Sequence, residues 1–387
     1  MERKVNKLMN DANSVVRLGG GIQIRCAENS DCEAALQSLH EKAAKFNFDH
    51  LLEVTTEHDG LEIRLSPSPV LLGRLPEIYN TLQLSEKLEL NSQNKPVDLE
   101  KEIFLSMLLG PQVFEFSGYA EIESAIRIRR NIVEAARRTA LAFHSSKIER
   151  PDDCWIYSEE RGFTVLPGKS LMEALRKATQ PEASGHRYAF SCYRATEYVI
   201  LLAIAQEIAT CNPALLLQLQ QQWETRAIMS RQFHDVFLHE FGSLSEPLPA
   251  GYYVPGDRLW FRNPDERSAD IAGYEGSWVF YLGNGLFSNF WERERPYTLA
   301  SKCIEIYHWR HGACEDKAGV LQMDEARVEQ CVRDTRRNPA EVERILGLMM
   351  RLRDPQGVYA DGGCIDASRE FPRCVCAGSA DVILPGV

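Results

Sequence analysis

The 387-residue sequence contains no long apolar run and no excess of basic residues. Its longest apolar stretch, YVILLAIA at 198–205, is far shorter than the roughly 20 residues that a membrane-spanning helix needs. The opening MERKVNKLMND is polar, which is not the pattern of a secretory signal. The formal net charge of −11 argues against nucleic acid and anionic membranes as partners, because both bind basic surfaces. We therefore expect a soluble, acidic, cytoplasmic protein.

The cysteines and glycines do not form the common site motifs. The 11 cysteines are odd in number, have no disulfide-framework spacing and include no Cys-x-x-Cys pair, which suits a reducing compartment. Cys364, Cys374 and Cys376 have no fourth ligand at a standard spacing, so we expect no zinc there. The run at 19–21, GGG, lacks the lysine of a phosphate loop, and no Gly-x-Gly-x-x-Gly follows a strand, so we expect no nucleotide.

The length predicts more than one domain, and the pattern of apolar and polar residues changes twice along the chain. Residues 1–97 predict a small α+β module of unknown role, with strand-like runs on both sides of GGG. A capping box of Ser30 and Glu33 is expected to open its helix, and a hairpin is expected to turn at Asp59-Gly60. The polar stretch 85–96 is typical of a linker. Residues 323–387 predict a helical extension and a cysteine-containing tail.

Residues 98–322 predict helices followed by strands. A helical stripe runs through EIESAIRIRRNIVEAARRTALAF, with apolar residues at Ile122, Ile126, Val133, Ala136, Ala140 and Phe143. A shorter helix is expected at KSLMEALRKA, a long one from near Phe190, and another from Asn212-Pro213 as N-cap and first helical residue. Strands are expected in RLWFRNP, SWVFYLG and GLFSNF, and a last helix in TLASKCIEIYHWRHG.

Cys192, in YAFSCYRATE, stands where the long helix is expected to begin. The unpaired N–H groups of a helix N-terminus stabilise a thiolate and lower the pKa of a cysteine, so this thiol should be alkylated quickly even at mildly acidic pH. A base or its orienter would then come from strands packed beside the helix. The alternative is a structural role, because free cysteine is among the most buried residue types.

Several blocks in this order carry a family resemblance: IRIRRNIVEAA, YAFSC, and GDRLWFRNPD followed by SWVFYLGNG. Between about residues 115 and 322 they resemble the bacterial spore-coat type protein-glutamine γ-glutamyltransferases. The resemblance implies an α+β fold with a papain-like core of helices packed on an antiparallel sheet, next to the small N-terminal α+β module. It also implies that Cys192 attacks a protein glutamine, releases ammonia and forms a thioester that a lysine amine resolves as an isopeptide bond.

The partners implied are therefore protein substrates, one a glutamine donor and one a lysine acceptor, and no metal, nucleotide or organic cofactor is required.

The chain departs from the family pattern at its polar positions. Ser191 replaces a glutamate before the nucleophile, Ser277 stands at the general-base position, and Asn289 replaces a histidine. Glu275, two residues before Ser277 and so on the same face of a strand, is the predicted base or thiolate partner.

Other polar and aromatic residues are also expected near Cys192. We expect Asn289 to orient a partner, and Ser191, Tyr274 and Trp278 to bind substrate, although core packing is the alternative for the aromatics, including Phe287 and Trp291. Glu275→Gln should lower the rate by roughly two to four orders of magnitude, and Asp257 is the next carboxylate to test.

The alternative functions are a Cys-dependent glutamine deamidase, with water as acceptor, and a catalytically decayed binding or structural protein. The oligomeric state is not indicated.

Overall fold

The computed structural model describes residues 20–75, 79–142, 148–354 and 362–385, which form a mixed α+β fold with mainly antiparallel sheets. The first strand-like run and Phe143 lie outside the described residues. None of the helices in the described ranges combines the length and apolar character that a bilayer crossing requires.

The N-terminal part is a four-stranded sheet in the order β2-β3-β1-β4 with helices beside it. The predicted hairpin is confirmed, because Glu57 pairs with Glu62 across the turn at 58–61. Its elements are β1 (Gly21–Arg25), β2 (Leu52–Glu57), β3 (Glu62–Pro67), β4 (Val113–Phe116), α2 (Asn29–Lys45), α3 (Pro69–Arg74), α4 (Leu84–Lys87), α5 (Pro96–Leu108) and 3-10 turns at Asp49–Leu51, His58–Gly60 and Thr81–Gln83.

Two local features of this module differ from expectation. The predicted capping box is wrong, because α2 begins one residue before Ser30 and its N-cap, Glu28, makes no side-chain cap hydrogen bond. Cys26 and Cys32 form a disulfide, although the cysteine spacing did not indicate one. The chain turns into α2 between them, and this turn brings their Cα atoms to 5.6 Å.

The central sheet has six antiparallel strands in the order β11-β10-β9-β8-β14-β7. The strands predicted in RLWFRNP, SWVFYLG and GLFSNF are confirmed as β8, β9 and β10. The predicted tail also contributes a strand, since Glu370 of β14 pairs with Glu240 on one side and Arg258 on the other. The strands are β7 (Leu238–Phe241), β8 (Arg258–Arg262), β9 (Gly276–Gly283), β10 (Leu286–Phe287), β11 (Tyr297–Thr298) and β14 (Arg369–Pro372).

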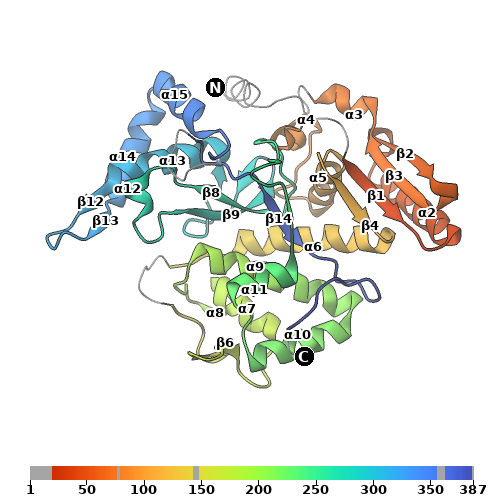
Figure 1. The fold of residues 1–387 in the computed structure, drawn as a ribbon, viewed down its shortest axis with the longest axis horizontal. Helices are drawn as coiled ribbons and strands as arrows, with labels where there is room; N and C mark the ends of the chain where they lie inside the picture. Colours follow the sequence, from red (N-terminus) through yellow and green to blue (C-terminus); the bar gives the residue numbers. More distant parts are fainter. Residues whose placement is uncertain (1–19, 76–78, 143–147, 355–361, 386–387) are drawn as a thin grey trace.

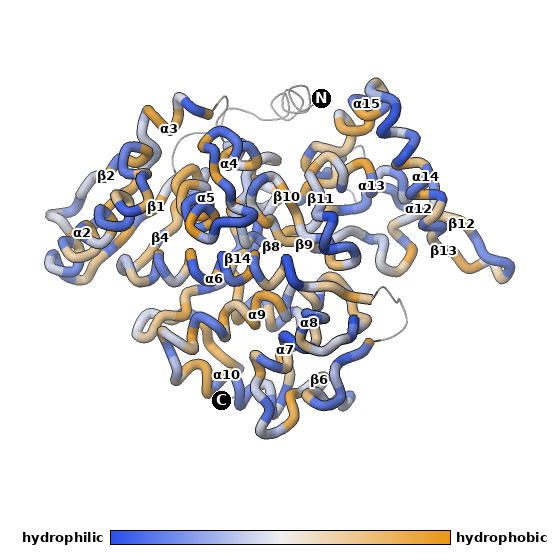
Figure 2. Tube along the Cα trace, turned by 180° about the vertical axis from the view of Figure 1, so that it is seen from behind, coloured by the Kyte–Doolittle hydropathy of each residue, from blue (hydrophilic) through white to orange (hydrophobic). Residues whose placement is uncertain are grey.

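A group of helices lies on one side of this sheet, with α6, α9 and α11 against its strands and with α7 and α10 against α9. The helices are α6 (Tyr119–Arg138), α7 (Leu171–Thr179), α8 (Pro181–Ser184), α9 (Cys192–Cys211), α10 (Pro213–Thr225) and α11 (Ser230–Phe237), with a hairpin of β5 (Trp155–Ser158) and β6 (Gly162–Val165). Helix α9 packs against α6, α7, α10 and β9, and residues 195–205 are buried without a break. Its central place and apolar colouring are visible in Figure 2. This buried surface is not apolar throughout, because Glu197 and Glu207 are also buried and pair with Arg194 and Arg127.

The last group of elements packs on the far side of the central sheet from the N-terminal module (Figure 1). It comprises α12 (Glu266–Ala269), α13 (Leu299–Gly312), α14 (Glu325–Arg336), α15 (Pro339–Met349), β12 (Ala313–Glu315) and β13 (Leu321–Met323). Helix α13 packs against both α14 and α15. The predicted division at residues 97 and 323 stays a prediction, although β4 joins the N-terminal sheet and β14 joins the central one from beyond those boundaries.

Candidate active site

Cys192 is the first residue of α9, as predicted, and it is half-buried. Ser191 is the N-cap, and its side-chain oxygen accepts a hydrogen bond from the Arg194 backbone N–H at 3.3 Å. This cap stabilises the helix start and fixes the backbone on which the thiol stands. Ser191 itself is exposed and is absent from the lining of the cavity described next.

A cavity of about 670 Å³ opens beside Cys192, a volume in the range of ligand sites. Its walls come from the start of β9, the segment 289–298, α13 and α14. Of the predicted site residues, Cys192, Tyr274 and Asn289 line it, together with Ser277. The structure therefore brings the predicted nucleophile and the position assigned to the general base into one cavity, from segments more than 80 residues apart in the sequence.

The pKa of Cys192 differs from expectation. Burial raises the pKa of the Cys192 thiol above its ordinary value, and this effect exceeds the opposing effects of its neighbours. The backbone N–H of Trp278, the charge of Lys302 and the N–H groups at the start of α9 each lower this pKa. The expected helix effect is thus present but is outweighed, because the thiol is enclosed by the cavity walls. The prediction of a lowered pKa is wrong.

Glu275 lies in the bend before β9 and is exposed. Its carboxylate accepts a hydrogen bond from the Gly273 backbone N–H at 3.0 Å, within its own turn. Glu275 would face the same side as Ser277 only on a continuous strand from 275 to 277, but β9 begins at Gly276. Glu275 does not line the cavity, so the structure does not bring this carboxylate to the predicted nucleophile.

Asn289 is buried and uses its amide to hold the loop that follows it. Its Oδ1 accepts the backbone N–H groups of Trp291 at 3.2 Å and Glu292 at 3.1 Å, and its Nδ2 donates to the Arg295 carbonyl at 3.0 Å. These three bonds shape the segment 289–295, which forms one rim of the cavity. Asn289 therefore orients a loop, and no hydrogen bond from its amide to Cys192 is present among the described residues.

The two aromatic residues predicted to bind substrate have different surroundings. The Tyr274 hydroxyl donates to Glu325 at 2.6 Å, and its ring packs edge-on to Trp309 at 5.2 Å, so it forms part of the cavity wall. The Trp278 ring does not line the cavity and stacks on Trp260 with centroids 5.9 Å apart. Neighbouring residues of a strand face opposite sides, so Ser277 faces the cavity and Trp278 contributes its backbone N–H.

Lys302 and Glu305 are cavity residues that the sequence did not indicate. They lie three positions apart on α13, with Lys302 Nζ 2.9 Å from Glu305 Oε1, and the Lys302 side chain is almost fully buried. Burial alone would lower the pKa of Lys302, but the charge of Glu305 and contact with Tyr297 raise it above its ordinary value. Lys302 is thus a permanent cation near the Cys192 thiol and cannot act as a base.

Asp257, the second carboxylate considered from the sequence, is fully engaged elsewhere. One oxygen accepts from Arg129 Nη1 and the other from the Val254 backbone N–H, both at 2.7 Å. Asp257 and Arg129 are both buried, and neither lines the cavity. This ion pair holds α6 against the start of β8 and belongs to the scaffold.

A family model described as protein-glutamine gamma-glutamyltransferase matches residues 79–362. The protein-glutamine gamma-glutamyltransferase of Halalkalibacterium halodurans is 24% identical over 199 residues, which are 49% of this chain and 62% of that relative. The chain thus spans about three fifths of the length of this curated relative.

A solved transglutaminase structure from Geobacillus stearothermophilus, without its C-terminal extension, has 21% identity and a TM-score of 0.37, covering 54% of this chain and 96% of that one. At that TM-score the likeness does not place individual residues. The family model, by contrast, covers more than half of the chain and includes Cys192, Ser277 and Lys302. The chain therefore belongs to the protein-glutamine gamma-glutamyltransferase family.

Proposed function

We propose that the protein transfers a γ-glutamyl group from a protein glutamine to a lysine amine, with Cys192 as nucleophile. The observation that carries this proposal is the position of Cys192, at the first turn of α9 and on the wall of the cavity, in a chain of this family. The proposal includes a papain-like arrangement, in which α9 carries the nucleophile and packs on β9 of the antiparallel sheet.

In the first step the Cys192 thiolate adds to the carboxamide carbon of the glutamine. The C–N bond then breaks, and ammonia leaves with a proton that water donates, so that a thioester remains and the hydroxide that deprotonated the thiol is regenerated. The Trp278 N–H and the N–H groups at the start of α9 lie beside the sulfur. Such donors are suited to stabilise the oxyanion of the tetrahedral intermediate.

In the second step a lysine amine attacks the thioester, forms the isopeptide bond and returns the proton and the electron pair to the sulfur. On the cavity wall, Glu292 and Glu329 form ion pairs with Arg295 and Arg333. Glu325 accepts from the neutral Tyr274 hydroxyl, and its carboxylate would attract the ammonium group of an incoming lysine. Attack by water in place of the amine would give glutamine deamidation. The acceptor that reaches the thioester therefore decides the product.

Neither position at which the family has glutamate supplies a carboxylate base to the thiol, because both are serines here. We infer that solvent hydroxide deprotonates Cys192 and that Lys302 stabilises the resulting thiolate by its charge. The reaction should consequently be slow at neutral pH and faster at alkaline pH.

A second candidate function is a catalytically decayed binding or structural protein. The same two serines and the raised pKa of Cys192 favour it, because a thiol that stays protonated is a poor nucleophile. In that case the cavity would hold a protein side chain without chemistry.

A direct test measures incorporation of a fluorescent primary amine into a glutamine-rich protein between pH 7 and 9.5, together with ammonia release. Cys192→Ala should abolish both, while Cys314→Ser, at another half-buried thiol, should change neither. Ammonia release without amine incorporation would identify a deamidase. Absence of both products across a panel of glutamine-containing proteins would refute enzyme activity and leave the binding function.

A further inference from the structure

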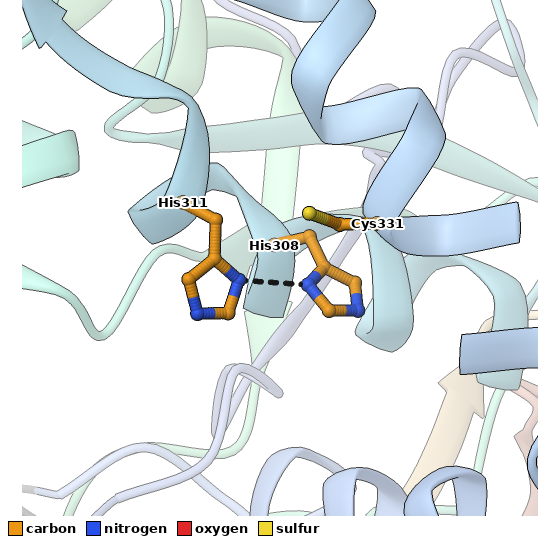
Figure 3. A group of neighbouring side chains, drawn as sticks. All are labelled: His308, His311 and Cys331. Carbon is orange, nitrogen blue, oxygen red and sulfur yellow. Dashed lines mark hydrogen bonds between the residues drawn. The ribbon is translucent and has the colours of Figure 1, made fainter. Parts of the chain in front are cut away.

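His308, His311 and Cys331 form a cluster that is separate from the lining of the Cys192 cavity (Figure 3). The histidines stand three positions apart on α13, which places them on one face of the helix, and Cys331 comes from α14. One ligand atom of each residue lies within 4.8 Å of the other two, and the two Nδ1 atoms are 2.9 Å apart. We propose that these three residues form a binding site for Zn²⁺ or a similar borderline-soft divalent ion.

The three ligand atoms all lie within 4.8 Å of one another, and side-chain rotation would have to bring them to the distances that an ion requires. Zinc binds nitrogen at about 2.0–2.1 Å and thiolate sulfur at about 2.3 Å, so tetrahedral ligands lie about 3.3 Å apart for two nitrogens and about 3.6 Å for nitrogen and sulfur. The Nδ1 atoms of His308 and His311 must therefore separate by about 0.4 Å from 2.9 Å. Rotation of the exposed His311 ring can supply this movement.

The surroundings of His308 resemble those of a metal-bound histidine. Its Nε2 lies 2.7 Å from the hydroxyl of the buried Thr335, one turn beyond Cys331 on α14. If this Nε2–H donates to Thr335, the Nδ1 lone pair faces His311 and Cys331. Metal-bound histidines commonly donate their second N–H in this way, which fixes the tautomer of the ring.

The protons also balance. Without a metal, one hydrogen joins the two Nδ1 atoms of His308 and His311. On binding, the ion replaces this hydrogen, which moves to His311 Nε2, and the Cys331 thiol releases its proton to solvent. A water can complete four-coordination from the exposed side of His311.

Charged groups also lie near the cluster. The charges of Arg310, Arg327 and Arg344 act on His311 and would repel a divalent cation, whereas Asp265 acts in the opposite direction. A Cys331 thiolate as ligand would offset one unit of the charge of the ion.

An ion bound at the cluster would stabilise the wall of the Cys192 cavity. Trp309 directly follows His308 and Val332 directly follows Cys331, and both Trp309 and Val332 line the Cys192 cavity. An ion at the cluster would therefore tie α13, which carries Lys302, to α14 at a fixed separation. The cluster lies outside the residues that take part in the reaction proposed above, and metal binding there does not require that reaction.

A second group of possible ligands among the described residues, Glu57, His58 and Glu62, gives an internal comparison. It offers two carboxylates and one imidazole, and two of its three residues are exposed. Its oxygen-rich ligand set favours hard cations, whereas the nitrogen and sulfur ligands of the cluster favour zinc or cobalt.

The test uses the full chain after treatment with a chelator, in the Cys192→Ala background, so that the proposed nucleophile cannot bind the ion. Zinc is titrated by calorimetry, and cobalt is titrated by absorption spectroscopy, in which a thiolate ligand gives a near-ultraviolet charge-transfer band. Cys331→Ser and His311→Ala are the test variants. Cys314→Ser and His58→Ala are the matched controls.

We expect one zinc per chain and, with cobalt, a tetrahedral spectrum with the thiolate band. Cys331→Ser should remove the band and weaken zinc binding at least tenfold, His311→Ala should weaken it similarly, and both controls should bind as the parent does. Equal melting temperatures of all variants in chelator would show that the fold is intact. Zinc binding that survives in both test variants, or a cobalt spectrum without the thiolate band, would overturn the proposal.

Discussion

The charge of Lys302 should control how fast Cys192 reacts, and the two residues of the Lys302–Glu305 pair should act in opposite directions. An ordinary cysteine has a pKa of about 8.5, and burial places Cys192 above this value, so fewer than about 1 in 30 thiols are ionised at pH 7. Because only the thiolate reacts, the rate of alkylation should rise about tenfold per pH unit up to about pH 8.5.

Lys302→Met removes the cation and leaves Glu305, so the pKa of Cys192 should rise further. A close charge changes a pKa by roughly 1–3 units, and we take the lower end because Glu305 already offsets part of the Lys302 charge, giving about a tenfold slower reaction at pH 7.5. Glu305→Gln leaves the cation uncompensated and should make the reaction faster.

The assay is iodoacetamide labelling read by mass spectrometry at each cysteine, with half-buried Cys314 as the internal reference. Labelling of Cys192 that is already maximal at pH 6.5 would contradict the raised pKa. Both variants shifting the rate in the same direction, with unchanged labelling of Cys314, would refute the electrostatic role of Lys302.

Three further outcomes are expected. Ser277→Glu, which places a carboxylate in the cavity, should raise the rate of amine incorporation by roughly 10- to 100-fold, whereas Ser277→Gln should not, and equal rates would contradict base catalysis from this position. Glu275→Gln should retain at least about half of the wild-type rate, since the carboxylate bonds to its own turn, and a hundredfold loss would restore Glu275 as the base. Asp257→Asn breaks a buried ion pair and should lower the free energy of unfolding by about 3–5 kcal/mol. In calorimetry the melting temperature should then fall by about 4–6 °C, whereas the surface substitution Asp153→Asn should leave the melting temperature unchanged.

Local chemistry explains which parts of the site the sequence predicts. The start of α9 follows from Ser191 as an N-cap before an apolar run, and the start of α10 follows from Asn212, whose side chain accepts the Leu215 N–H at 3.2 Å. Both signals lie within a few residues of the feature they predict. The hairpin between β2 and β3 is predictable for the same reason.

The features of the site that the sequence does not predict depend on tertiary contacts. Glu275 would point toward Cys192 only if β9 included residue 275, but the bend before Gly276 turns this carboxylate back to Gly273. A Cβ at Gly276 would come within 2.1 Å of the Trp260 indole, a contact that no local pattern reveals. Lys302 was correctly placed on a helix, yet its approach to Cys192 depends on how α13 packs across the sheet. The rise in the Cys192 pKa likewise comes from enclosure by distant segments.

The position of β14 has a consequence for protein synthesis. This strand lies between β7 and β8, and Arg369 pairs with Phe241, which precedes it by 128 positions. At about 5–20 residues per second, a ribosome needs roughly 6–26 s to add those positions. During that interval β7 and β8 of the nascent chain present unpaired backbone edges, which readily pair with other chains. The growing polypeptide should therefore aggregate most readily in this window, and a holding chaperone should bind it there.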